Sequence, residues 1–285
     1  MTPFWEATSG RLLDRLVRAG APAVLFWFGG LALVPGGPAW LTTAPGAFLF
    51  AGALVGSAVV VNQVAPLALR VLQGPWPGPL KELSRKRTAE ISARVEADEL
   101  KWRELTAAVR SDLATDEERA EHVELERRLS RCSADVAQHQ PTRVGTLLSA
   151  AQARVNEKYG LDAVITWPRL WLVLPKAARD ELAAARAALH SSAATMVWAA
   201  LFCGFTWWSW WALPIGVSLL VVTAWFWVPA RAAHFAALFE STYDLHRAAL
   251  YEQLRWPMPS SPVKEREQGR ALTSYLLRGT RPSLT

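Results

Sequence analysis

The chain has 285 residues, of which 51% are hydrophobic, and its formal net charge at pH 7 is +6. The hydrophobic residues are concentrated in two long blocks without Asp, Glu, Lys or Arg, residues 19–69 and 187–230. This distribution excludes an ordinary water-soluble globule and a disordered chain. The basic residues form no dense block, and their distribution does not indicate nucleic-acid binding.

Residues 1–20 predict an amphipathic helix in the plane of the lipid headgroups, because basic residues alternate there with apolar ones. A secretory signal peptide is the alternative, although no small-residue cleavage site follows the first apolar stretch. Residues 21–69 are long enough to cross a bilayer twice and predict the first transmembrane hairpin. Its two spans are expected at 21–41 and 47–69, joined by a short uncharged turn.

The second of these spans contains small and polar residues that an apolar helix does not need. Gly52 and Gly56 lie four residues apart and allow a neighbouring helix to approach closely, so we predict helix packing there. Asn62 and Gln63 follow at membrane depth, where an amide without a hydrogen bond is costly. Two interpretations stay open: the amides bond to a neighbouring helix or to backbone freed by Pro66, or they line an intramembrane polar path.

Residues 70–190 predict a cytoplasmic helical region, because charged residues of both signs surround apolar residues at helical spacing. The first two helices are expected to meet at residues 114–115 and to form an antiparallel hairpin. Thr115 and Glu118 have the spacing of a capping box at the start of the second helix. The apolar stripes are narrow, which favours packing within a helical bundle or against another subunit.

A third helix is expected to begin at Pro141 and to end at Gly160. The segment that follows, residues 159–175, is too short to cross a bilayer and too apolar for a free loop. We therefore predict that it lies at the cytoplasmic membrane surface.

Four residues of this segment are candidates for gating or lipid contact. Asp162 is placed to cap the helix that follows it, and Trp167 and Trp171 share one face of that helix. Arg169 falls on another face. A charge close to the bilayer is retained only with a partner or water, so Asp162 and Arg169 are the charges most open to a specific role.

Three stretches of this region form a pattern: Arg143-Val-Gly-Thr-Leu-Leu-Ser-Ala-Ala, Tyr159-Gly-Leu-Asp-Ala-Val and Trp167-Pro-Arg-Leu-Trp. The pattern resembles one found in uncharacterised four-helix membrane proteins of high-GC Gram-positive bacteria, over residues 141–230. No activity is attached to that group, so the resemblance implies a topology and carries no site residues. We interpret the pattern as a dock between the cytoplasmic helices and the bilayer; a ligand-binding or gating site is the alternative.

Residues 191–230 predict the second transmembrane hairpin. Four tryptophans near its turn are expected at one membrane face, because Trp prefers the headgroup boundary: Trp207, Trp208, Trp210 and Trp211. Residues 231–256 predict a C-terminal cytoplasmic helix. Residues 257–285 turn polar and predict a flexible tail.

The sequence contains no GxSxG, HExxH or phosphate-binding GxxxxGK motif, and its two cysteines and five histidines are scattered. We therefore expect no enzymatic activity, no cofactor and no metal site. An enzyme acting on lipid is the least favoured alternative, since no set of acids, bases or metal ligands lies near the membrane surface.

These elements together predict an all-α polytopic protein of the cell membrane, with four transmembrane helices in two hairpins and a cytoplasmic helical bundle. The positive-inside rule places both termini in the cytoplasm. We expect an integral membrane scaffold, in contact with lipids, whose cytoplasmic helices recruit a protein partner or form a homo-oligomer. The alternative is an oligomeric ion channel or pore, because the order of elements, and only the order, resembles that of bestrophin channels.

Overall fold

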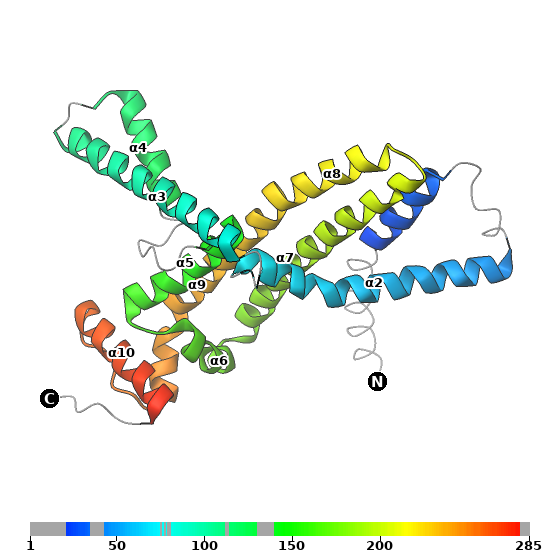
Figure 1. The fold of residues 1–285 in the computed structure, drawn as a ribbon. Coiled ribbons are helices and arrows are strands. Elements are labelled where there is room, and N and C mark those ends of the chain that lie inside the picture. Colours follow the sequence, from blue (N-terminus) through cyan, green and yellow to red (C-terminus); the bar gives the residue numbers. More distant parts are fainter. Residues whose placement is uncertain are drawn as a thin grey trace. The chain divides into compact units, whose positions relative to one another are not determined.

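The computed structural model describes residues 21–34, 43–74, 76, 78, 81–111, 114–129 and 140–279. All regular structure in these ranges is helical (Figure 1). The chain divides into two compact units, unit 1 from residues 1–71 and 186–231 and unit 2 from residues 72–185 and 232–285. The interfacial helix predicted at residues 1–20 lies outside the described residues.

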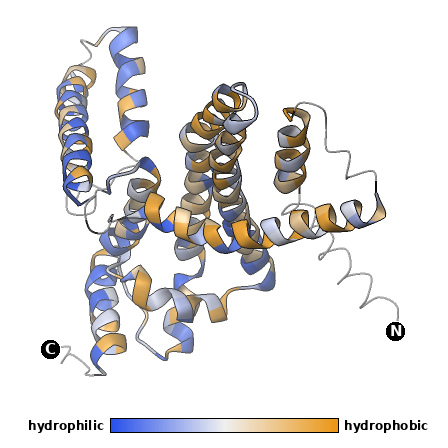
Figure 2. Cartoon of the chain, turned by 45° about the vertical axis from the view of Figure 1, so that its right-hand side comes forward, coloured by the Kyte–Doolittle hydropathy of each residue, from blue (hydrophilic) through white to orange (hydrophobic). Residues whose placement is uncertain are grey.

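Within the described ranges, three helical stretches are long and apolar enough to cross a membrane. The first is α2, Ala44–Gln73, and the second is Lys176–Trp207, which contains α7 (Lys176–Phe202). The third, Ala212–Gln253, contains α8 (Ala212–Val222) and α9 (Val228–Gln253). Figure 2 shows the contrast between the hydrophobic α2 and α8 and the largely hydrophilic α3 and α4. The chain is thus an all-helical protein compatible with a membrane location.

The first predicted span is described only in part. An apolar helix runs from Ala21 to Ala32, and it is shorter than the three stretches above. At 1.5 Å per residue it extends about 18 Å, whereas the hydrocarbon core of a bilayer is about 30 Å thick. Residues 35–42 lie outside the described ranges, so a fourth crossing stays a prediction.

Unit 1 is held together by aromatic and small apolar side chains. The buried residues of α2 are Gly46 near its start and three residues at a spacing of four: Val61, Ala65 and Leu69. The indole of Trp27 donates a hydrogen bond to the Ser57 hydroxyl of α2 (3.0 Å), and the ring centroids of Phe26 and Trp198 are 4.7 Å apart. The short helix Ala21–Ala32 therefore packs with both α2 and α7.

The passage from α7 to α8 is a tight turn that contains the four predicted tryptophans. A 3-10 helix, Cys203–Trp207, ends α7, and α8 begins at Ala212. The four indoles are 54–89% exposed. A π-helical turn at Thr223–Trp227 then joins α8 to α9 without a break. The assignment of these tryptophans to a membrane face stays a prediction.

Unit 2 begins with two charged helices, α3 (Lys81–Arg110) and α4 (Asp116–Leu129), which lie side by side in Figure 1. The capping box is present: the Thr115 N–H donates to the Glu118 carboxylate (2.8 Å), and the Glu118 N–H donates to the Thr115 hydroxyl (3.3 Å). Leu105 and Leu125 are the buried residues of the two helices. Residues 130–139 lie outside the described ranges.

The core of unit 2 is shared by α5 (Arg143–Tyr159), α6 (Ala163–Val173), α9 and α10 (Pro262–Arg278). As predicted, α5 ends at Gly160, whose φ of 68° is the left-handed conformation that suits glycine. Side chains from all these helices and the segments between them are fully or almost fully buried: Val155, Leu161, Leu170, Tyr243, Leu250, Tyr251 and Leu272.

The C-terminal segment differs from the flexible tail predicted at residues 257–285, because its central part forms α10. Ser261 caps this helix by accepting a hydrogen bond from the Lys264 N–H, and a proline occupies its first turn. Leu272 is fully buried in the core of unit 2. The prediction failed because a single buried stripe on a charged helix has a weak sequence signal, and only the tertiary contact completes it.

Candidate functional site

Both charges singled out on α6 are bound to the backbone of that helix. As predicted, Asp162 caps it, because its carboxylate accepts hydrogen bonds from the N–H groups of Val164 (2.8 Å) and Ile165 (3.4 Å). The Arg169 guanidinium donates to the Ile165 carbonyl (2.6 Å). The two side chains therefore stabilise α6 itself and are not paired with each other.

The two tryptophans of α6 lie on one face, as their spacing predicted, with ring centroids 5.8 Å apart. Trp167 is also 4.7 Å from the Phe239 ring and 6.1 Å from the Tyr243 ring, both on α9. Trp171 packs against the same core. Their packing partners lie in unit 2, and the expected role in lipid contact or gating stays a prediction.

The face of α6 away from the core is also apolar. Val164 is 71% exposed and Leu172 is 77% exposed, with the exposed Pro168 between them at a spacing of four residues. An exposed apolar stripe of this kind is a candidate contact surface. The sequence held this signal in the spacing of the three residues, but the prediction concentrated on the tryptophans.

A buried polar pair fixes α6 to α9. The hydroxyls of Thr166 and Tyr243 are 3.0 Å apart, and Tyr243 also lies within reach of the Ala163 carbonyl (3.4 Å). Neither residue is accessible to solvent. Because an unpaired buried hydroxyl would cost about 1–3 kcal/mol, this pairing favours one register of α6 on α9. Neither residue was predicted from the sequence.

A charged network joins α5, α9 and α10. The Arg247 guanidinium lies 4.3 Å above the Tyr159 ring and donates from Nε to the Glu265 carboxylate (2.6 Å). The Tyr159 hydroxyl donates to the Asp244 carboxylate. Burial, and then this hydrogen bond to Asp244, raise the pKa of Tyr159 to about 12. The phenol is therefore neutral at physiological pH and acts as a donor.

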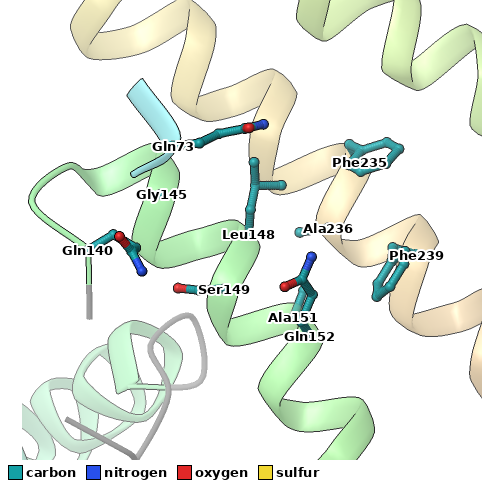
Figure 3. A pocket seen from close by; sticks show the side chains of 10 residues that line it. All are labelled: Gln73, Gln140, Gly145, Leu148, Ser149, Ala151, Gln152, Phe235, Ala236 and Phe239. Carbon is teal, nitrogen blue, oxygen red and sulfur yellow. The ribbon is translucent and has the colours of Figure 1, made fainter. Parts of the chain in front are cut away.

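One open cavity of about 290 Å³ occurs in unit 2, between α5, α9 and the last turn of α2 (Figure 3). Its lining combines apolar side chains with three amides and a hydroxyl: Gln73, Gln140, Gly145, Leu148, Ser149, Ala151, Gln152, Phe235, Ala236 and Phe239. None of these side chains is charged, so the lining suits a small neutral molecule.

Gly145, from the first stretch of the sequence pattern, lies beside this cavity. A steric constraint requires a glycine at this position. A Cβ at this position would collide with the backbone carbonyl of Gln73, the last residue of α2. The Thr142 hydroxyl donates to the Leu72 carbonyl in the same place. The start of α5 thus packs against the end of α2. This contact explains why the first stretch of the pattern has a glycine at position 145.

The residues singled out on α2 make no side-chain contact of the predicted kind with the part of the chain that the structure describes. Gly52 and Gly56 are exposed, and a Cβ at either would meet nothing within 4 Å. Asn62 and Gln63 are exposed too, without a hydrogen bond to any described residue. The structure therefore leaves open both the predicted packing at the glycines and the predicted polar path at the amides.

Among the described residues, no group of three or more His, Cys, Asp or Glu side chains is arranged to hold a metal ion. No protein-family model, curated protein or solved structure matches the chain. The function is therefore inferred from the geometry within each unit.

Proposed function

We propose that this protein is a non-enzymatic membrane scaffold. In this proposal the apolar helices anchor the chain in the cell membrane, and the helices of unit 2 recruit a protein partner or assemble with further copies of the chain. The observation that carries the proposal is the pair α3 and α4, whose only buried residues are Leu105 and Leu125. A helix as long as α3 gains most of its stability from packing, so this pair suits further packing on a partner.

The pair α3 and α4 is held by polar contacts that leave most of its surface available. Lys101 and Glu121 form an ion pair with an N–O distance of 2.5 Å, and the rings of Trp102 and His122 stack with centroids 5.7 Å apart. Leu100 and Val123 are exposed apolar residues on the two helices. Mixed charge with scattered apolar residues is typical of helices that associate with other helices.

The proposed topology places unit 2 in the cytoplasm. The residues flanking the apolar stretches on the side of unit 2 include Arg70, Arg186 and Arg231, whereas the turn between α7 and α8 carries no charge. The positive-inside rule then assigns the arginine side to the cytoplasm. Two hairpins with four spans place both termini in the cytoplasm.

An oligomeric channel or pore is the second candidate function. It is favoured by Asn62 and Gln63, two exposed amides on an apolar helix that form no hydrogen bond to a described residue. In a ring of subunits such amides would line a polar path. The order of apolar and polar elements, which resembles that of bestrophin channels, is compatible with this candidate.

Planar-bilayer recording separates the two functions. The protein is purified in mild detergent, its oligomeric mass is measured, and the same sample is reconstituted. The scaffold predicts a silent membrane at a protein density where the assembled oligomer is present. Steady unitary conductance that disappears in the Asn62→Leu/Gln63→Leu variant would favour the channel and contradict the scaffold.

A further inference from the structure

The exposed side of α2 combines an open notch at two glycines with a polar side chain that has no hydrogen bond to a described residue. Gly52, Gly56, Val59 and Gln63 follow one another at spacings of four, three and four residues, so they fall within about 60° of the helix surface. The buried Val61 and Ala65 lie on the opposite side. Only 11% of the apolar stretch of α2 is buried, against 33% for that of α7.

The Gln63 amide makes this surface costly in a single chain. Arg70 lies seven residues further along α2, so Gln63 is about 10 Å deeper in the membrane than the arginine. It is exposed and has no hydrogen bond to a described residue. In hydrocarbon an amide without a partner is unfavourable, and hydrogen bonding to another helix removes that cost.

A second copy of this chain supplies the matching partner. Two copies inserted with the same topology place each residue of α2 at the same depth, so a two-fold axis along the membrane normal brings Gln63 opposite Gln63. A primary amide carries both hydrogen-bond donors and an acceptor, so the Gln63 amides of the two copies can hydrogen-bond to each other. The same axis brings the open Gly52 and Gly56 notches together, where the backbones can approach closely.

We infer that α2 forms the interface of a homo-oligomer, in which the surface Gly52, Gly56, Val59 and Gln63 packs on the same surface of a second copy. This inference rests on the homo-oligomer of the proposed function and names its contact surface. The seam has the 3-4 spacing of a left-handed helix pair, with a polar residue at one core position, an arrangement that fixes register.

The test measures dimerisation of the full chain in lipid nanodiscs or liposomes, by single-molecule photobleaching across a range of protein densities. Four variants are compared with the native chain: Gly52→Leu/Gly56→Leu, Gln63→Leu, Asn62→Leu and Gly204→Leu. Gly204 also lies in unit 1 and has nothing within 4 Å of a Cβ, so it controls for added bulk. Asn62 lies about 100° from Gln63 around the helix and controls for loss of an amide.

The double glycine variant is expected to abolish the oligomer, and Gln63→Leu is expected to weaken association about 3- to 30-fold. Gln63→Asn should restore part of the loss, while Gly204→Leu should match the native chain and Asn62→Leu should come close to it. A native oligomer that survives the double glycine substitution would overturn the α2 interface and leave the proposed oligomer intact. A native chain that stays monomeric at every density would overturn both.

An equal loss in Asn62→Leu and Gln63→Leu, with the double glycine variant unaffected, would also overturn the interface and favour the polar path. Melting of each variant in detergent, followed by intrinsic fluorescence, distinguishes a lost contact from a misfolded unit. All the substituted positions are exposed, so their melting temperatures should stay close to the native value.

Discussion

Gly160 and Gly269 lie where α5 meets α10, each against the backbone of the opposite segment, and neither position has room for a side chain. A Cβ at Gly160 would collide with the carbonyl oxygen of Arg266, and one at Gly269 would collide with that of Tyr159. The contact places the end of α5, which belongs to the conspicuous sequence pattern, on the C-terminal helix that the sequence analysis expected to be loose.

Substituting Gly269 tests this contact. Gly269→Ala should lower the free energy of unfolding by about 1–3 kcal/mol, because the backbone of α5 has to move away. Gly160→Ala should cost at least as much, since its φ of 68° also disfavours alanine. Gly204→Ala is the control, as a Cβ there meets nothing, and it should stay within about 0.5 kcal/mol of the native protein. Denaturant unfolding in mild detergent measures the three values; equal values would contradict the contact.

The ion pair between Arg154 and Glu240 should contribute more than the exposed pairs of α3. Its side chains are 21% and 20% exposed, and Arg154 Nε donates to the Glu240 carboxylate at 2.9 Å. Glu240→Gln should destabilise the protein by about 1–3 kcal/mol, because the guanidinium loses its charged acceptor. Glu99 and Arg103, with 41% and 64% exposure, form the matched exposed pair, and Glu99→Gln should cost about 0.3–0.5 kcal/mol. Similar losses of stability in the two variants would contradict the expectation that the less exposed pair contributes more.

The number of transmembrane spans determines on which side of the membrane the N-terminus lies. In a background with Cys132→Ser and Cys203→Ser, single cysteines at Thr2, Ser111 and Thr206 can be labelled on intact cells with a membrane-impermeant maleimide. Four spans predict labelling at Thr206 alone, because residues 2 and 111 are then cytoplasmic. Labelling at both Thr2 and Thr206 would indicate three spans, and labelling at Ser111 would contradict the cytoplasmic position of unit 2. Permeabilised cells control for reactivity.

The exposed stripe of α6 should contact lipid if residues 159–175 lie at the membrane surface. A fluorophore attached at Leu172→Cys is expected to be quenched several-fold more by brominated lipids than one at Asp180→Cys, because position 172 lies on the apolar face and Asp180 is an exposed charge on α7. Equal quenching at the two positions would contradict the membrane-surface segment. Both labels use the chain without its native cysteines.

The hydrogen-bond network around Tyr159 should affect the stability of the protein and the titration of this phenol at alkaline pH. The phenol has a pKa of about 12 in the folded protein and about 10 when unfolded, so its neutral form is favoured by folding. The stabilisation is present below pH 10 and is lost as pH rises from 10 towards 12. The difference in tyrosinate absorbance between the native chain and Tyr159→Phe should therefore have its midpoint near pH 12. Asp244→Asn should lower that midpoint, and an unchanged midpoint would show that the carboxylate has no part in it.

Local signals in the sequence were sufficient to predict where several helices begin and end and which residues share a helix face. The capping box at Thr115, the end of α5 at Gly160, the cap at Asp162 and the common face of the two tryptophans on α6 all occur as predicted. Each depends on residues within four positions of one another, so no distant contact is needed to form it.

Contacts between residues far apart in the sequence could not be predicted from such local signals. Nothing near Gly269 in the sequence indicates that the backbone of Tyr159 lies against it, and nothing near Gly145 indicates the end of α2. The glycines and amides of α2 show the same limit, because their exposure became visible only when the helix was placed in unit 1.

The sequence by itself determined that the chain is helical, where its apolar stretches lie and how several helices begin and end, because these depend on composition and short-range hydrogen bonds. The tertiary structure decided which face of each helix is buried. It turned the expected tail into α10 and left one side of α2 without a packing partner among the described residues. The physical reason is that burial depends on which surfaces meet, and residues far apart in the sequence supply the two surfaces of each contact.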